Sequence, residues 1–308
     1  SLSLSLSLSL SLSLSLSDLC APRTHAWLLD LFFDCPAGAF QPTVGTKWFG
    51  VCGQPGDPSF GVPGACDVGC PGPELRGAVE SAIRSGGIAW HAFPSNNEPE
   101  AGDAALTRAA IDSVHLLDDR FGLPHKTVVS QRDVPGVTRG IVPLLAGKGV
   151  VAFSEGKNTA VANPAVPSPI FNWTDLASGT SVIFMNHYQG YGAAADDDAT
   201  VSTHETLGLS LADTVTLRGF DEALVFAFRG DNGGPQTQTQ VESNIAAVKN
   251  LFPNATVIGS TLDAFVSALL KHGTEALPVV TSEIGDTWIY GLQADPKKTQ
   301  VRLTSTFS

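Results

Sequence analysis

TVVSQRDVPGVTRGIVPLLAGKGVVAFS, residues 127–154, is the stretch from which the fold of this chain can be predicted. It starts with one short apolar run, 127–130, and ends with another, 150–154, and both runs are typical of strands that are buried on both faces. Between them, residues 137–145 place apolar side chains on one face of a helix. A strand, a helix and a strand in this order predict a parallel sheet covered by helices.

The same alternation of helices and strands continues on both sides of this stretch. Before it we predict a helix over 74–85, a strand over 88–93 and an amphipathic helix over 103–121; after it, strands over 181–185, 223–228, 255–258 and 277–281, with helices over 238–252 and 262–270. No G-x-G-x-x-G or G-x-x-x-x-G-K-S/T turn follows a strand, so a nucleotide cofactor is not indicated. Six or seven such units favour a closed (β/α) barrel over an open nucleotide-binding sheet.

Two amino-terminal segments are predicted to lie outside the barrel domain, which we assign to residues 74–308. Residues 1–17 begin with eight Ser-Leu dipeptides. Strict alternation suits a strand with one apolar face, but identical dipeptides define no unique register, so a disordered tail or an error in the gene model is predicted. Residues 18–73 are predicted to be irregular, because nine Gly and seven Pro occur in the 38 residues 36–73, a density that prevents helices and central strands.

The cysteines and sequons indicate an oxidising compartment. The five cysteines are Cys20, Cys35, Cys52, Cys66 and Cys70. A zinc cluster would need close pairs, and only Cys66 and Cys70 come near one, so one or two disulfides are predicted instead. Two sequons, Asn172-Trp-Thr and Asn254-Ala-Thr, point the same way. We therefore expect the protein in the secretory pathway or outside the cell.

The charge balance and the hydropathy argue against two classes of protein. The 308 residues include 18 Lys and Arg against 30 Asp and Glu, a net charge of −12, whereas a protein that binds nucleic acid through its phosphates needs a basic surface. No run of about 18 apolar residues is present, so no membrane-spanning helix is predicted. Hydrophobic residues make up 43% of the chain, enough for a sizeable folded core.

Polar side chains follow nearly every predicted strand. In parallel α/β folds the loops after the carboxyl ends of the strands build the active site, so these side chains are predicted to meet around one opening. They are His91, Gln131, Arg132, Asp133, Glu155, Asn158, Asn186, His187, Asp231, Asn232, Ser260, Thr261, Asp263, Glu283 and Asp286. Carboxylates gathered there would share protons, bind a cation or have shifted pKa values.

Each of these residues also has a structural alternative. Asp133 precedes Val-Pro-Gly and could cap the following turn; His91 could be a core histidine, and Asp231 and Glu283 could belong to turns. The aromatic residues at or near the same loops are Trp90, Trp173, Tyr188, Tyr191, Trp288 and Tyr290. Aromatic faces beside carboxylates suit sugar rings, so a carbohydrate is the predicted partner.

Four motifs together resemble a known family. They are Trp90-His91-Ala92-Phe93-Pro94 with Asn97 and Glu100, Gln131-Arg132-Asp133-Val134-Pro135-Gly136-Val137-Thr138-Arg139, Gly230-Asp231-Asn232-Gly233-Gly234-Pro235-Gln236, and Thr281-Ser282-Glu283-Ile284-Gly285-Asp286-Thr287-Trp288-Ile289-Tyr290-Gly291. Over residues 74–298 the chain is similar to an uncharacterised family that in turn resembles the catalytic barrel of glycoside hydrolase family 38, the alpha-mannosidase type. The resemblance implies a seven-stranded β/α barrel and a retaining, zinc-dependent glycosidase.

The resemblance also implies roles for individual residues. Asp133 stands at the position of the nucleophile, which in the family is also a metal ligand; His187 is a further metal ligand, and Glu100 or Asp231 is the acid/base. The residues predicted to bind the sugar are His91, Arg132, Tyr191, Asn232, Glu283, Asp286 and Trp288. No His-x-Asp zinc pair of the family precedes residue 74, so the barrel is expected to lack its first strand and two zinc ligands.

We therefore predict a glycoside hydrolase-like barrel that cleaves a glycosidic bond by a retaining carboxylate mechanism. The missing zinc pair makes an inactive, truncated chain an open alternative. A second is a carbohydrate deacetylase in which Asp133 and His187 hold a metal that activates water, and a third is a carbohydrate-binding barrel without catalytic activity. Metal content separates the binding barrel from the two enzymes, and the released product, sugar or acetate, separates the enzymes from each other.

Overall fold

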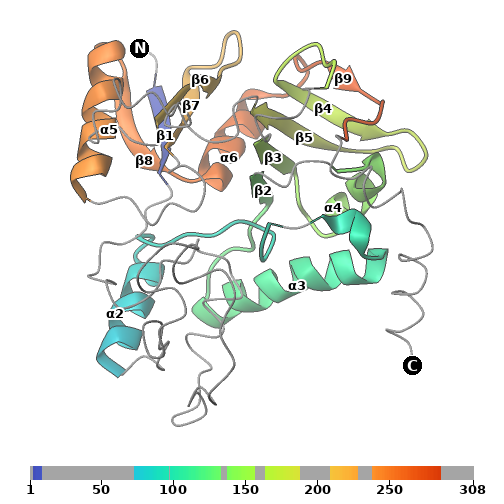
Figure 1. Ribbon diagram of the computed structural model, residues 1–308, viewed down its shortest axis with the longest axis horizontal. Helices are drawn as coiled ribbons and strands as arrows, with labels where there is room; N and C mark the ends of the chain where they lie inside the picture. Colours follow the sequence, from blue (N-terminus) through green and yellow to red (C-terminus); the bar gives the residue numbers. More distant parts are fainter. Residues whose placement is uncertain are drawn as a thin grey trace, which may run out of the picture.

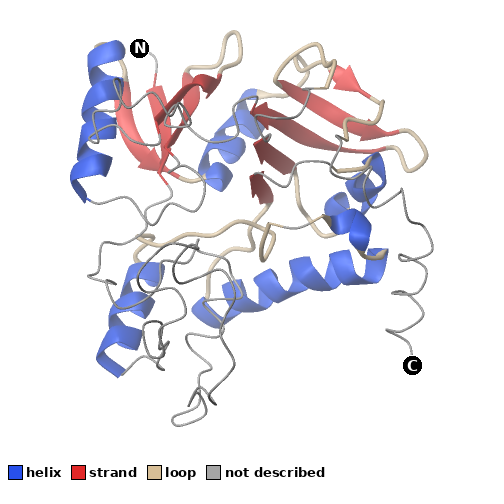
Figure 2. Ribbon diagram, in the orientation of Figure 1, coloured by secondary structure: helices blue, strands red, loops and turns tan. Residues whose placement is uncertain are grey.

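The strands of this chain form two sheets that lie side by side, with helices around them (Figure 1, Figure 2). The computed structural model describes residues 3–8, 73–96, 98–132, 137–156, 164–187, 209–227 and 238–285. All five cysteines, and with them the predicted disulfides, lie outside the described residues. Within the described part of the chain, no helix has both the length and the apolar character needed to cross a membrane.

The first sheet has five strands in the order β2-β3-β5-β4-β9. Their bounds are Val128–Arg132 for β2, Ala152–Gly156 for β3, Ile170–Asp175 for β4, Thr180–His187 for β5 and Val279–Val280 for β9. Strands β2, β3 and β5 are parallel to one another, which confirms the parallel arrangement predicted from the apolar runs at 127–130, 150–154 and 181–185.

The strand β4 was not predicted, because polar residues interrupt its apolar pattern. It pairs antiparallel with β5 and parallel with β9. The tight turn between β4 and β5 ends at Gly179, whose φ of 68° is unfavourable for other residues. Asp175 closes this turn, since its backbone carbonyl accepts from the Gly179 N–H at 2.9 Å and its Oδ2 accepts from the Ser178 N–H at 2.9 Å.

The second sheet has four strands in the order β6-β7-β1-β8. Their bounds are Ser3–Leu8 for β1, Leu209–Val215 for β6, Glu222–Ala227 for β7 and Thr256–Ser260 for β8. Strand β1 is parallel to both of its neighbours, β7 and β8, while β6 is antiparallel to β7. The sheet is therefore built around a strand from the very start of the chain.

Strand β1 consists of Ser-Leu dipeptides, which differs from the prediction of a disordered tail and of a fold without its first strand. The register places Leu4 opposite Ala223 of β7 and Val257 of β8. A two-residue repeat matches the period of a strand, and the space between two parallel strands offers hydrogen-bond partners to the backbone on both sides. These two properties outweigh the lack of a unique register for Ser3–Leu8.

The described residues form five α-helices. Their bounds are Pro73–Arg84 for α2, Ala104–Phe121 for α3, Val142–Ala146 for α4, Gln238–Leu251 for α5 and Leu262–His272 for α6, with short 3₁₀ helices η1 at Pro99–Ala101 and η2 at Arg139–Ile141. The prediction for α3 is confirmed: Asp103 caps its start by accepting from the Leu106 N–H at 2.8 Å, and Gly122 ends it with φ 65°. The apolar spacing that includes Val114, Leu117 and Phe121 would also place Leu106 on the buried face, but Leu106 is exposed.

Two predicted elements differ in the structure. The helix expected over 137–145 is divided into η2 and α4, with Gly140 inside η2 and Pro143 in the first turn of α4. The segment 88–93, expected to be a strand, is an irregular stretch that bends ahead of Pro94. One backbone hydrogen bond, from the Ala92 N–H to the Val128 carbonyl at 2.8 Å, joins it to β2.

The five-stranded sheet has one apolar core on each of its faces. Register partners on parallel strands point to the same face, and Val129, Phe153 and Phe184 belong to the core beneath α3 and α4. The alternate residues of these strands, including Val128 and Ile183, belong to the core shared with β7 and α6. The helix α6 thus lies between the two sheets (Figure 1).

The closed barrel is not established by these pairings. No described strand is paired with both sheets, and the segment 88–93, which would help to connect them, makes only the single bond to β2. The fold shown is mixed α/β with a parallel-rich sheet, and closure of seven strands stays a prediction. The carboxyl ends of β2, β3 and β5 nevertheless lie together, as the predicted site requires.

Candidate active site

Two rows of polar residues end the parallel strands β2, β3 and β5. In one row Gln131, Glu155 and Asn186 are register partners, and the next row contains Arg132 and His187 on either side of Gly156. Successive residues of a strand point to opposite faces. The first row therefore faces the core under α3 and α4, and the second faces β7.

On the face toward β7, a buried hydrogen-bonded chain links three strands. The Arg132 Nη2 donates to Ser154 Oγ at 3.1 Å, and this hydroxyl is hydrogen-bonded to His187 Nε2 at 2.9 Å. The ring of Phe226 on β7 packs against both ends, 4.1 Å from the His187 ring and 5.0 Å from the Arg132 guanidinium carbon. Arg132 and His187, two predicted site residues, are thus brought together, and a cation–π contact helps to stabilise the buried guanidinium.

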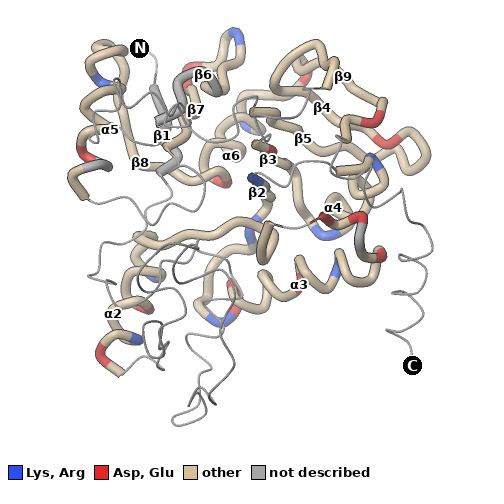
Figure 3. Tube along the Cα trace, in the orientation of Figure 1, with Lys and Arg blue, Asp and Glu red and all other residues tan. Residues whose placement is uncertain are grey.

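On the opposite face, two carboxyl groups lie close together. Burial is the largest of the effects that together raise the pKa of Glu100 from 4.5 to about 7; the carboxylates of Glu155 and Glu98 also raise it, and a hydrogen bond from the Thr138 N–H at 2.5 Å lowers it. Glu155 itself is 1% exposed. Beside it in the register, the buried amide of Asn186 has no hydrogen-bond partner among the described residues. Figure 3 shows basic and acidic positions next to each other at β2 and β3.

The side chain of Asn96 fixes the end of β2. Its Nδ2 donates to the Arg132 carbonyl at 2.6 Å, and its Oδ1 accepts from the Arg132 N–H at 3.1 Å. Both polar groups of the Arg132 backbone are therefore held by one amide, as a neighbouring strand would hold them. Together with the Glu100–Thr138 bond, this contact joins the first sequence motif to the second.

The last motif reaches the same loop. Glu283 Oε2 accepts from the Arg139 N–H at 2.7 Å, and the Arg139 guanidinium donates to the Thr281 carbonyl and lies 3.5 Å from Asp175. Glu100 and Glu283 therefore bind the backbone N–H groups of consecutive residues, 138 and 139. Three motifs that are distant in the sequence meet around η2.

These contacts give Glu100 and Glu283 structural roles, since each accepts a hydrogen bond from the backbone at η2. His91 is half-buried, and its Nδ1 accepts weakly from the Phe93 N–H at 3.4 Å. The predicted site residues that lie outside the described part of the chain are Asp133, Asn158, Tyr191, Asp231, Asn232, Asp286 and Trp288. The described site residues are divided between two faces of one sheet, with Arg132 and His187 on one and Glu100 on the other.

The described residues do not by themselves fit a zinc site. Among them no group of three or more His, Cys, Asp or Glu side chains is placed to hold a metal ion. His187 Nε2, the natural donor for zinc, is occupied by the Ser154 hydroxyl. The guanidinium of Arg132 bonds the same hydroxyl, which adds a positive charge where a cation would bind.

The likeness between this chain and solved structures is a likeness of fold, because the sequence identities are low. An alpha-mannosidase from Enterococcus faecalis V583 superimposes on 69% of this chain with a TM-score of 0.51 and 19% sequence identity. The fold of this chain resembles that of glycoside hydrolase family 38 alpha-mannosidases. The match covers 24% of the mannosidase, so the chain spans about a quarter of that enzyme.

Two weaker likenesses accompany the alpha-mannosidase. A glycosyl hydrolase family 38 protein from Enterococcus faecalis matches 68% of this chain and 21% of its own length, with 15% identity and a TM-score of 0.44. A 4-alpha-glucanotransferase from Thermococcus litoralis matches 68% of this chain and 30% of its own, with 11% identity and a TM-score of 0.40. No protein-family model and no curated protein matches the sequence.

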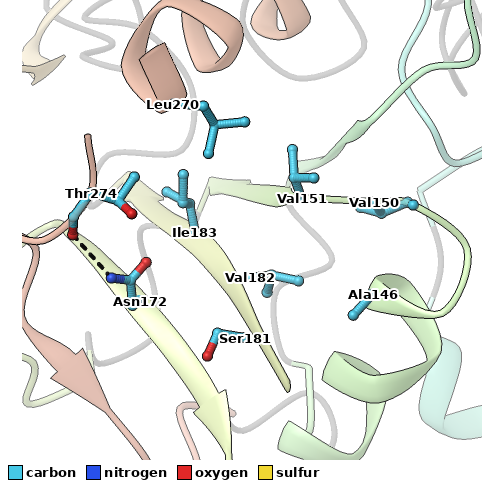
Figure 4. Close-up of a pocket in the computed structure, with 10 residues that line it drawn as sticks. Ala146, Val150, Val151, Asn172, Ser181, Val182, Ile183, Leu270 and Thr274 are labelled. Carbon is cyan, nitrogen blue, oxygen red and sulfur yellow. Dashed lines mark hydrogen bonds between the residues drawn. The ribbon is translucent and has the colours of Figure 1, made fainter. Parts of the chain in front are cut away.

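A cavity lies near the amino-terminal ends of β3 and β5, at the opposite end of these strands from the two polar rows. It has a volume of about 310 Å³ and is lined mainly by apolar side chains, among them Val150, Val182 and Leu270 (Figure 4). Asn172 also faces it and donates to the Thr274 carbonyl at 3.2 Å. No predicted site residue lines this cavity, which is consistent with a structural role for the amino-terminal side of the sheet.

Two residues of the site, Asn96 and Ser154, were not predicted to take part. Asn96 lies within the first motif, and its neighbour Asn97 was named there instead. Ser154 ends the apolar run VVAFS, where a small polar residue is an ordinary strand terminus. Its position was visible in the sequence, but the contact with Arg132 and His187 depends on the strand order β2-β3-β5.

Proposed function

We propose that this chain is a glycoside hydrolase-like protein that cleaves a glycosidic bond through two carboxyl groups, Asp133 as nucleophile and Glu100 as acid/base. The observation that carries the proposal is the pKa of Glu100, which burial raises to about 7. A carboxyl group that stays protonated near neutral pH can donate a proton to a leaving oxygen. The likeness of the fold to an alpha-mannosidase supports a glycoside as the substrate.

In the sequence, Asp133 lies close to two residues, Arg132 and Thr138, that contact Asn96 and Glu100. Asp133 directly follows Arg132, whose backbone is held by Asn96, and stands five residues before Thr138, whose N–H binds Glu100. In a retaining reaction the protonated Glu100 would protonate the glycosidic oxygen while the Asp133 carboxylate attacks the anomeric carbon. Glu100 would then take a proton from water while the water oxygen bonds to the anomeric carbon and the bond from that carbon to Asp133 breaks, which releases the sugar.

Zinc has no assigned step in this proposal. Asp133 and His187 are the ligands that the family resemblance suggests, and the described donors do not fit the metal while His187 Nε2 is bonded to Ser154. What His187 and Arg132 contribute is a pair of buried polar side chains at the ends of β5 and β2. Measurement of zinc in the purified protein tests the metal separately from the carboxylates.

A carbohydrate-binding protein without catalysis is the second candidate. It is favoured by β1, because a central strand made of Ser-Leu dipeptides brings no carboxylate or imidazole to the site. Sugar binding would then rest on the polar groups of the other strands. Binding without turnover distinguishes this candidate from the hydrolase.

The experiment compares leaving groups of different acidity. The purified chain is assayed with 4-nitrophenyl and 4-methoxyphenyl α-mannosides, with Asp221→Asn and Glu275→Gln as controls at exposed carboxyls. Asp133→Asn should lower the rate on both substrates at least 10²-fold, and Glu100→Gln should lower it by about 10²–10⁴-fold on the methoxyphenyl substrate but much less on nitrophenyl, whose leaving group needs little protonation. Equal rates for wild type and Asp133→Asn would overturn the nucleophile assignment.

A further inference from the structure

The two sequons of this chain have the same chemistry but lie in different structural settings. An N-glycan is attached to the Asn side chain of N-x-S/T, and the glycan is bulky and must project into solvent. Both Asn172-Trp-Thr and Asn254-Ala-Thr lie within the described residues. Their accessibility can therefore be compared directly.

The sequon at Asn172 is engaged in the five-stranded sheet. Asn172 pairs with Ile183 of β5 on one side and with Val279 of β9 on the other. Its Nδ2, the atom that would carry the glycan, donates to the Thr274 carbonyl at 3.2 Å, and Figure 4 shows this bond at the edge of the cavity. A glycan there would displace the Thr274 contact at a residue that the two neighbouring strands hold on both sides.

The other two residues of this sequon are engaged as well. Trp173 is fully buried, and its Nε1 donates to the Ser282 carbonyl at 3.0 Å. The Thr174 hydroxyl, which the sequon requires, is hydrogen-bonded to Ser181 Oγ at 2.8 Å. Every part of the Asn172 sequon is thus used by the folded sheet.

The sequon at Asn254 lies in an exposed turn between α5 and β8. Asn254 and Thr256 are both exposed, as are residues 251–253 before them. The turn is closed through the backbone, since the Ala255 N–H donates to the Phe252 carbonyl at 2.9 Å. The Asn254 side chain therefore has open solvent around it, and its modification would disturb no strand pairing.

Exposed apolar side chains surround this turn. Leu251 is 55% exposed and Phe252 is 37% exposed at the end of α5, and Ile258 on β8 is 46% exposed on the same face as Thr256. An apolar surface of this kind favours association between molecules. A hydrophilic glycan at the turn would cover it.

We propose that Asn254 is the N-glycan acceptor of this chain and that Asn172 is not modified. The donor is a lipid diphosphate-linked oligosaccharide. The Asn254 Nδ2 forms a bond to the anomeric carbon of the oligosaccharide and loses a proton, while the bond from that carbon to the diphosphate oxygen breaks and the lipid diphosphate leaves. The proposal is independent of any hydrolase activity and depends on passage through the secretory pathway.

The test is secretion of the full chain, behind a cleavable signal peptide, from a eukaryotic host. Wild type should carry one glycan, seen as a single mobility shift on treatment with an amidase that removes N-glycans and as conversion of Asn254 to Asp in the peptide mass. Asn254→Gln and Thr256→Val should both abolish the shift. Asn172→Gln and Thr174→Val should leave it unchanged.

Two variants at each sequon keep the result independent of folding. Asn172→Gln loses the bond to Thr274 and can fail to be secreted, whereas Thr174→Val retains Asn172 and is close to isosteric. The proposal is overturned if secreted wild type carries no glycan, if the shift persists in Asn254→Gln, or if the Asn172 peptide is modified. None of these readouts involves sugar turnover, so loss of the proposed hydrolase function would not affect them.

Discussion

Glu100 combines three features that a general acid needs: burial, neighbouring negative charge and one remaining hydrogen bond. Its Oε1 accepts from the Thr138 N–H, and its Oε2 is buried without a partner among the described residues. A carboxylate in that setting lacks the hydrogen bonds that would stabilise its charge. The neutral acid is therefore the favoured form in the folded protein until about pH 7.

The raised pKa of Glu100 predicts a specific loss of stability with pH. Below pH 4.5 the Glu100 carboxyl is neutral in both the folded and the unfolded chain. Between pH 4.5 and about 7 the carboxyl ionises in the unfolded chain but stays protonated in the folded one, so the free energy of unfolding falls. This loss is complete above about pH 7. Glu100→Gln cannot ionise, so relative to wild type it should gain about 2–3 kcal/mol between pH 4.5 and pH 8. Urea unfolding at the two pH values measures this, with exposed Glu275→Gln as the control. A gain no larger than that of the control would contradict the raised pKa.

Some of this site could be predicted from residue types and some could not. Arg132, His187, Glu100 and Glu283 were all expected at the strand ends or motifs, and the structure places each of them around β2, β5 or η2. Their division between two faces of the sheet was not expected, because it follows from register. Asp263 was expected among the polar side chains around the opening, yet it accepts from the Thr127 N–H at 2.7 Å just before β2 begins, while Thr261 caps α6.

The Ser-Leu strand shows how far local pattern predicts an element. Alternation alone is compatible with a strand, and parallel neighbours on both sides are provided by β7 and β8. Those neighbours come from residues more than 200 positions later. The sequence near residues 3–8 therefore gives no sign that β7 and β8 have room for a strand between them. The antiparallel strand β4 was missed for the related reason that its partners, β5 and β9, compensate for its polar residues.

The repeat predicts that β1 tolerates a shift of its register by whole dipeptides. Deletion of residues 1–8 leaves residues 9–16, which have the same sequence as residues 1–8, so an identical strand can form between β7 and β8 and the urea midpoint should not change. Deletion of residues 1–16 removes every such window, and stability should fall by about 1 kcal/mol for each backbone hydrogen bond lost. Replacing residues 1–16 with Gly-Ser dipeptides of equal length is the matched control. If the eight-residue deletion destabilises as much as the sixteen-residue one, the register of Ser3–Leu8 is unique.

The whole molecule is organised by long-range contacts around one loop. The residues that meet at η2 come from three parts of the chain, near positions 100, 138 and 283, and Asp175 of β4 joins them through Arg139. Trp173, also on β4, binds the Ser282 carbonyl. The predicted site thus depends on the segment 281–285 being held against the sheet, while the apolar cavity lies at the opposite end of the strands.

Arg139 is the side chain through which this arrangement can be tested. Its guanidinium donates to the Thr281 carbonyl and lies 3.5 Å from the Asp175 carboxylate, and it is 33% exposed, so solvent screens the ion pair only in part. Arg139→Ala should lower the free energy of unfolding by about 1–2 kcal/mol, chiefly through the lost hydrogen bond, and should speed amide exchange in residues 281–285. Arg108→Ala, on the exposed face of α3, should change stability by less than about 0.5 kcal/mol. Equal effects of the two substitutions, with unchanged exchange at 281–285, would show that Arg139 does not hold the last motif in place.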